Sequence, residues 1–74
     1  MQEFVEYIIK SLIDSGAEVK VELEDDKFIV TLPRSEMGKV IGRQGKIVKA
    51  IRTIVRGAGM KDGRAYGVEI VEMQ

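Results

Sequence analysis

The residues with the clearest chemical potential in this sequence surround two glycines, Gly42 and Gly45, which are separated by Arg43 and Gln44. A glycine has no Cβ atom, so the backbone can bend sharply there and approach a ligand closely. A helix that begins after Gly45 would leave its first N–H groups without partners and with positive partial charge, which suits a phosphate. Full positive charges stand around the same point, on Lys39, Arg43 and Lys46. This spacing predicts a clamp for a sugar-phosphate backbone.

Two glycines at this spacing also have ordinary explanations. In that interpretation, Gly42 is simply the C-cap of a helix and Gly45 simply forms a sharp corner, and neither contacts a ligand. A Walker A phosphate loop is excluded, because Val40 stands where its first glycine should be and Ile47 where Ser or Thr should bind magnesium. The apolar pair Val40 and Ile41 before the loop favours a binding role, since it predicts a wall against which bases can lie.

The composition excludes several classes of function. The 74 residues include no cysteine and no histidine, which removes disulfides, thiolate metal sites, most zinc sites and most general-base arrangements. The carboxylates gather in the N-terminal half without a partnered base. We therefore expect no enzyme, no catalytic residue, no metal site and no cofactor. Apolar runs are far shorter than the ~20 residues that span a bilayer, so we expect a cytoplasmic protein without a membrane partner.

Charge is strongly segregated along the chain although the formal net charge is zero. Residues 1–33 carry eight acids and three lysines, for a net charge of −5, and residues 34–64 carry nine bases and two acids, for a net charge of +7. Local field depends on where charges sit, so a neutral total is compatible with a polyanionic partner. The alternative is a mixed, solvated surface.

The hydrophobic pattern predicts the order α-β-β-α-α-β in a single domain over residues 1–74. We expect helices at 2–15, 35–41 and 45–58 and strands at 18–24, 27–32 and 66–73. Gly16 is expected to end the first helix, Ser35 to cap the second, and Gly57 and Gly59 to end the third. Strand 3 must return after a helical crossover, so it should lie parallel to strand 2 in a mixed sheet of order 1-2-3. The fold class is therefore two-layer α+β, with three helices on one face.

The segment Met37–Lys46, followed by Ala50–Thr53, resembles the signature of K-homology (KH) domains, and the element order resembles their type II arrangement. Nearly the whole chain is similar to the small bacterial single-KH family called KhpA. This resemblance implies a domain that binds single-stranded RNA, pairs with itself and pairs with a larger KH-containing partner, KhpB. It implies backbone clamping by Gly42–Gly45 and a base-lining wall. The expected RNA-binding residues are Lys39, Val40, Ile41, Gly42, Arg43, Gln44, Gly45, Lys46 and Lys49.

Some features keep two interpretations. The basic stripe Lys49, Arg52 and Arg56 extends the RNA path or is a solvated helix face. All the aromatic residues except Tyr7 fall on apolar faces and are expected in the core: Phe4, Phe28 and Tyr66. Ile29 and Val71 are expected on the sheet face away from the helices, as an interface or as ordinary exposed apolar residues. The main alternative function is an interaction module, a homodimer or a KhpB heterodimer, in which RNA contact is secondary.

Overall fold

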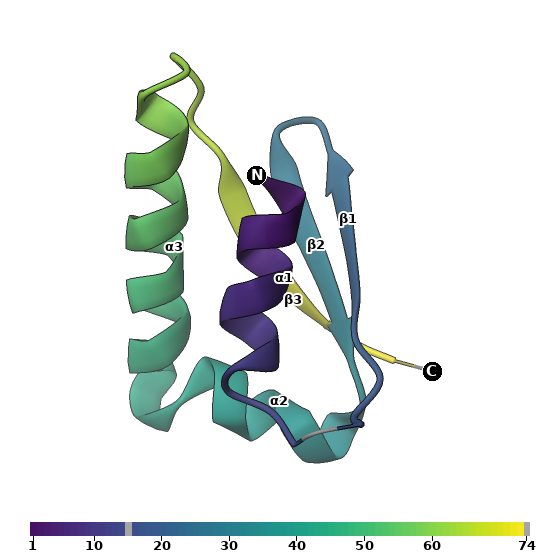
Figure 1. Ribbon diagram of the computed structural model, residues 1–74. Coiled ribbons are helices and arrows are strands. Elements are labelled where there is room, and N and C mark those ends of the chain that lie inside the picture. Colours follow the sequence, from purple (N-terminus) through teal and green to yellow (C-terminus); the bar gives the residue numbers. More distant parts are fainter. Residues whose placement is uncertain (15, 74) are drawn as a thin grey trace.

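A computed structural model of the chain describes residues 1–14 and 16–73. Its elements follow the predicted order, with a short 3₁₀ turn added between the second and third helices (Figure 1). They are α1 (Gln2–Lys10), β1 (Lys20–Glu24), β2 (Lys27–Leu32), α2 (Arg34–Ile41), η1 (Arg43–Gly45), α3 (Lys46–Met60) and β3 (Gly67–Glu72). Figure 1 shows the α2–α3 corner and the β1–β2 turn at opposite ends of the molecule.

The sheet has the predicted topology. Its strand order is β1-β2-β3, with β1 antiparallel and β3 parallel to β2. Asp25 and Asp26 form the hairpin turn with φ of 50° and 59°, values that aspartate tolerates better than most residues. Pro33 follows β2 directly and cannot donate to a ladder, so the strand ends there. The mixed sheet predicted from the crossover argument is confirmed.

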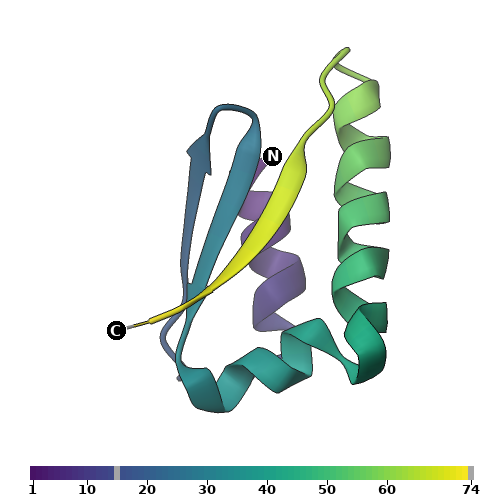
Figure 2. The same cartoon turned by 180° about the vertical axis from the view of Figure 1, so that it is seen from behind.

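The core lies between the sheet and the helices. Its fully buried members come from α1, β2, α2 and α3: Val5, Ile9, Phe28, Val30, Leu32, Val40 and Val55. Phe28 and Tyr66 pack with ring centroids 5.1 Å apart, as expected for core aromatics. Seen from behind, the sheet turns a face without a helix toward the viewer (Figure 2). The register places Ile29 on that face beside Glu22 and Glu69, and Val71 beside Thr31.

Several predicted details were wrong. α1 ends at Lys10, well before Gly16, because the chain turns at Ser11 and the Leu12 N–H bonds Ile9 O in a tighter i→i+3 turn. The predicted last residue, Ser15, lies outside the described residues. The N-cap of α2 is Pro33, without a side-chain cap bond, and α3 continues through Gly57 and Gly59 to Met60.

The apolar stripes also extend beyond the buried area. Phe4 is 41% exposed and Ile54 49% exposed, although both follow the helical period of their neighbours. Neither of them is therefore a core residue. Among the described residues, no helix combines the length and the apolar character needed to cross a membrane.

Candidate nucleic-acid interface

The corner between α2 and α3 is built from backbone in unusual conformations. Gly42 ends α2 with φ 76° and ψ 174°, and its N–H donates to Gly38 O at 2.9 Å. Gln44 (φ 56°) and Gly45 (φ 74°) then take the left-handed conformation, and α3 starts at Lys46. The side chains of Arg43 and Gln44 are exposed at this corner. The sharp turn therefore presents two polar side chains just before a helix N-terminus.

The two glycines are required for different reasons. A Cβ atom on Gly42 would stand 2.5 Å from Ile47 Cγ1, so packing as well as a positive φ demands glycine there. A Cβ atom on Gly45 would meet only Val48 Cγ1, at 3.9 Å, so the backbone conformation alone favours glycine. Both ordinary explanations, a helix cap and a sharp corner, are thus correct. The glycines shape the corner, and evidence for a ligand must come from the groups around it.

The N-terminus of α3 offers backbone N–H groups beyond that of Lys46, which donates to Arg43 O. Its N-cap, Gly45, has no side-chain cap bond, and the first turn of the helix contains no acidic residue. The first N–H groups of a helix lack intrahelical partners and carry positive partial charge. The exposed Lys46 adds a full charge at the same point.

Ion pairing divides the twelve lysines and arginines into two groups of six. The paired group comprises Lys10, Lys20, Lys27, Arg34, Lys39 and Arg64. Within residues 1–14 and 16–73, the other six make no ion pair: Arg43, Lys46, Lys49, Arg52, Arg56 and Lys61. All six lie between the corner and Lys61, the residue that follows α3, so the uncompensated positive charge is concentrated there.

Comparison with known proteins places the sequence in a family. The sequence model of the KhpA/KhpB KH domain matches residues 2–70. The chain is 47% identical to the RNA-binding protein KhpA of Clostridium perfringens, over 96% of this chain and all of that protein. It is 41% identical to proteins of the same name from Clostridium acetobutylicum (96% of this chain, all of that protein) and Aquifex aeolicus (97% and 96%). The chain belongs to the KhpA/KhpB family of KH domains.

Membership in this family confirms the resemblance drawn from Met37–Lys46. The α+β architecture, with a parallel β2–β3 pair joined by α2 and α3, is that of a type II KH domain. The glycine loop at the α2–α3 corner contains the motif on which the resemblance was based. The geometry of that corner is the basis on which roles are proposed for its individual residues.

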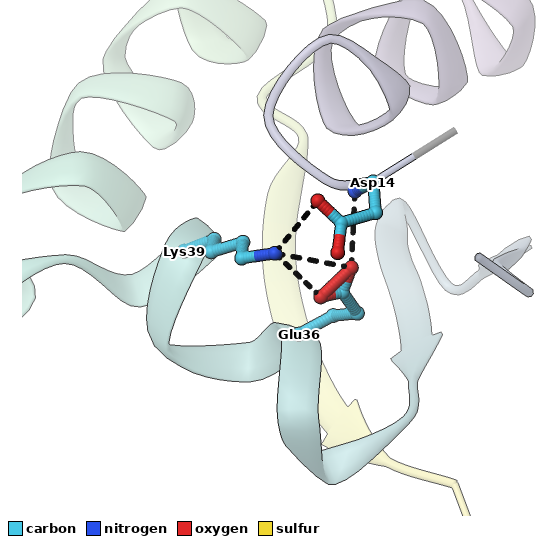
Figure 3. A network of polar contacts seen from close by, with 3 residues as sticks. All are labelled: Asp14, Glu36 and Lys39. Atoms are coloured by element: carbon cyan, nitrogen blue, oxygen red, sulfur yellow. Dashed lines mark hydrogen bonds and ion pairs between the residues drawn. The ribbon is translucent and has the colours of Figure 1, made fainter. Parts of the chain in front are cut away.

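The structure does not bring all nine expected RNA-binding residues to one surface. The Arg43, Gln44, Lys46 and Lys49 side chains are exposed, and Ile41 is half-buried. Val40 is fully buried, so its side chain belongs to the core beneath a wall and not to its surface. Lys39 directs its ammonium group toward two carboxylates, Asp14 and Glu36, as Figure 3 shows.

Three polar residues have contacts that sequence reasoning missed. Glu36 is the one charged residue buried in the described chain, and it occupies an apolar position of α2 one turn before Val40. That position in the helical period was the available signal. Asp14 donates its N–H to Glu36 across 22 residues of sequence, which no local pattern reveals. Arg52 donates from Nε to Val68 O at 3.1 Å, so it ties α3 to β3.

Within residues 1–14 and 16–73, no group of three or more His, Cys, Asp or Glu side chains is arranged to hold a metal ion. Asp14 and Glu36 both form ion pairs with Lys39.

Proposed function

We propose that this chain binds single-stranded RNA, with the Gly42–Gly45 loop and the N-terminus of α3 holding the sugar-phosphate backbone. The observation that carries the proposal is the run of lysines and arginines from Arg43 onward that make no ion pair within residues 1–14 and 16–73. This run lies beside a helix N-terminus that has no side-chain cap. Phosphates are bound by such helix ends and by lysine and arginine side chains. Relatives of nearly the same length are named RNA-binding proteins, which agrees with this assignment.

The residues proposed to contact RNA are fewer than the sequence suggested. Arg43, Lys46 and Lys49 supply charge, Gln44 supplies a hydrogen-bonding group, and the half-buried Ile41 offers apolar surface. KH loops of this kind hold about four backbone nucleotides. The role is that of a non-enzymatic binding module, and the cytoplasmic location expected from the sequence stays a prediction.

The loop is tested by replacing Arg43 and Gln44 together with aspartate. Both side chains are exposed, and aspartate tolerates the left-handed conformation of residue 44, so stability should change by only about 0.5 kcal/mol. Two negative charges beside the phosphates would oppose docking. We expect RNA binding, followed by fluorescence anisotropy, to be lost while the thermal melt stays near that of the parent.

The matched control carries the same change of charge elsewhere. Replacing Lys20 and Tyr7 with glutamate lowers the net charge equally, at exposed positions of β1 and α1. This variant should bind RNA nearly as well as the parent. Equal binding by the parent and the aspartate variant would remove the loop from the RNA site.

A second candidate function is the interaction module, either as a homodimer or with a KhpB-like KH partner. It is favoured by exposed apolar side chains on α3, where Ile54 is 49% and Met60 68% exposed. Exposed apolar surface of this kind is common at protein–protein contacts. Sedimentation at several protein concentrations tests self-association, and co-purification with the partner tests the heterodimer.

A further inference from the structure

Asp14, Glu36 and Lys39 form a closed polar network at one end of the sheet (Figure 3). Lys39 Nζ lies 2.9 Å from Asp14 Oδ1 and 3.0 Å from Glu36 Oε2. The backbone N–H of Asp14 donates to Glu36 Oε1 at 3.0 Å. These contacts join the loop after α1 to both turns of α2.

The burial of Glu36 makes this network structurally demanding. The Glu36 side chain is 6% exposed, and with Val40 it is one of two buried residues of α2. A buried carboxylate is costly unless it is paired and hydrogen-bonded, and each oxygen of Glu36 has a partner here. The polar network therefore helps to hold this short helix in place, together with the fully buried Val40.

The same contacts change the role expected for Lys39. Its ammonium group is shared between two carboxylates, so the three side chains together carry a net charge of −1. Such a group does not attract a phosphate in the way that Arg43 and Lys46 can, since these two make no ion pair in the described part of the chain. The two carboxylates more than neutralise its charge, so the network as a whole does not favour a phosphate.

The network is directly connected to the glycine loop. Lys39 lies in the last turn of α2, and the N–H of Gly42 continues that helix by donating to Gly38 O. A shift or rotation of α2 therefore moves Gly42 and the start of the loop with it.

We propose that Asp14, Glu36 and Lys39 are positioning residues for the Gly42–Gly45 loop, and that Lys39 serves RNA binding through α2 rather than through a phosphate. The proposal rests on the proposed RNA-binding function. It makes Glu36, a buried acid, favourable for binding a polyanion.

The decisive variant is Glu36→Gln. A purely electrostatic role of the carboxylate and a positioning role predict opposite changes in RNA affinity for this variant. By charge alone, removing an acid near the loop strengthens RNA binding. If the network positions the loop, the variant binds about three- to tenfold more weakly, the size of coupling usual for residues outside a site. Anisotropy should be measured well below the melting temperature, with circular dichroism confirming a folded protein. Binding equal to or tighter than the parent overturns the proposal.

Asp14→Asn provides the same test if Glu36→Gln does not fold. Its side chain is 78% exposed, its backbone N–H bond to Glu36 can persist, and it also removes a negative charge. Weaker RNA binding by this variant supports positioning, and unchanged or tighter binding contradicts it.

Variants of Lys39 distinguish a positioning role from a direct contact with a phosphate. Lys39→Met should weaken binding without changing the salt dependence, whereas loss of a phosphate contact lowers the magnitude of the log–log slope by about 0.7. Lys39→Arg, which keeps the charge, should restore binding. A slope reduced in Lys39→Met overturns the proposal for Lys39.

A different result would show that the proposed RNA-binding function itself is wrong. If the parent protein does not bind RNA at all, the RNA site is wrong, and positioning is judged on the free protein from the amide NMR shifts of Gly42 and Gly45. Shifts displaced in Glu36→Gln support positioning of the loop by the network, and unchanged shifts contradict it.

Discussion

Ile47 fills the space that a side chain at position 42 would need. A Cβ atom on Gly42 would lie 2.5 Å from Ile47 Cγ1 and 2.8 Å from its Cβ. Ile47 follows the corner and packs against the core, so the residue that would collide with position 42 also anchors α3. The loop and the core therefore constrain each other.

We predict that Gly42→Ala destabilises the protein more than Gly45→Ala. Both substitutions force alanine into positive φ, at a cost of about 1–2 kcal/mol in the left-handed conformation of residue 45 and about 1–3 kcal/mol in the nearly glycine-only conformation of residue 42. Position 42 adds an overpacking cost of about 1–3 kcal/mol against Ile47. Urea denaturation gives both free energies of unfolding. In the background of Ile47→Ala, the cost of Gly42→Ala should fall, because Cγ1 and Cδ1 are gone. Equal costs at positions 42 and 45 would contradict this account of the corner.

Two glycines near the end of α3 should respond to alanine with opposite signs. Gly57 is exposed, and a Cβ atom added there would meet nothing within 4 Å, so Gly57→Ala should stabilise the helix by about 0.5–1 kcal/mol. A Cβ atom on Gly59 would lie 2.6 Å from Tyr66 Cδ2 and 2.8 Å from Arg64 O, so Gly59→Ala should destabilise by about 1–3 kcal/mol. Thermal melting of the two variants provides the comparison. A rise of both melting temperatures would show that the approach of α3 to Arg64 and Tyr66 is looser than these distances indicate.

These glycines illustrate what the sequence could and could not reveal. Helical and strand periods gave the order of elements, and the crossover rule gave the parallel β2–β3 pair. Gly57 and Gly59 looked like helix ends because glycine is common there, but Gly59 is needed where α3 passes close to Tyr66. A close approach between distant segments leaves no local pattern.

The same limit applies to the candidate site. The spacing of Gly42 and Gly45 identified the corner, and Arg43 and Lys46 proved to be exposed there. Lys39 is a lysine close to the loop in sequence, as Lys46 is, yet its ammonium group forms ion pairs with Asp14 and Glu36. Charge segregation identified the basic region, whereas the pairing of each base depends on tertiary contacts.

The salt dependence of RNA binding should reflect the lysines and arginines that make no ion pair in the described part of the chain. On a single strand, each neutralised phosphate contributes a log–log slope of about −0.7, so Arg43, Lys46 and Lys49 together predict roughly −2. Lys46→Gln should reduce the magnitude by about 0.7. Lys20→Gln, at a lysine paired with Glu22 on β1, should leave the slope unchanged. An affinity insensitive to salt would show that the basic region serves another partner.

The last prediction concerns alkaline stability. The pKa of Lys39 is raised above its ordinary value of 10.5, chiefly by its hydrogen bond with Asp14 and then by that with Glu36. The unfolded chain lacks these partners, so the folded protein holds this proton more tightly. The resulting stabilisation is complete below the unfolded-state pKa and is lost as the pH rises through the folded-state pKa. The parent should therefore be more stable than Lys39→Met at neutral pH, and this advantage should shrink above pH 10.5.

Urea denaturation of both proteins from neutral to strongly alkaline pH measures this difference, in which the titration of all other groups largely cancels. Lys46→Met is the matched control, because Lys46 makes no ion pair within residues 1–14 and 16–73. Its stability should track that of the parent at every pH, since an exposed lysine without a partner contributes little. If the advantage over Lys39→Met persists unchanged above the raised pKa, the ammonium charge does not hold α2 to the loop after α1. The stem of the lysine side chain would then account for the stabilisation through packing.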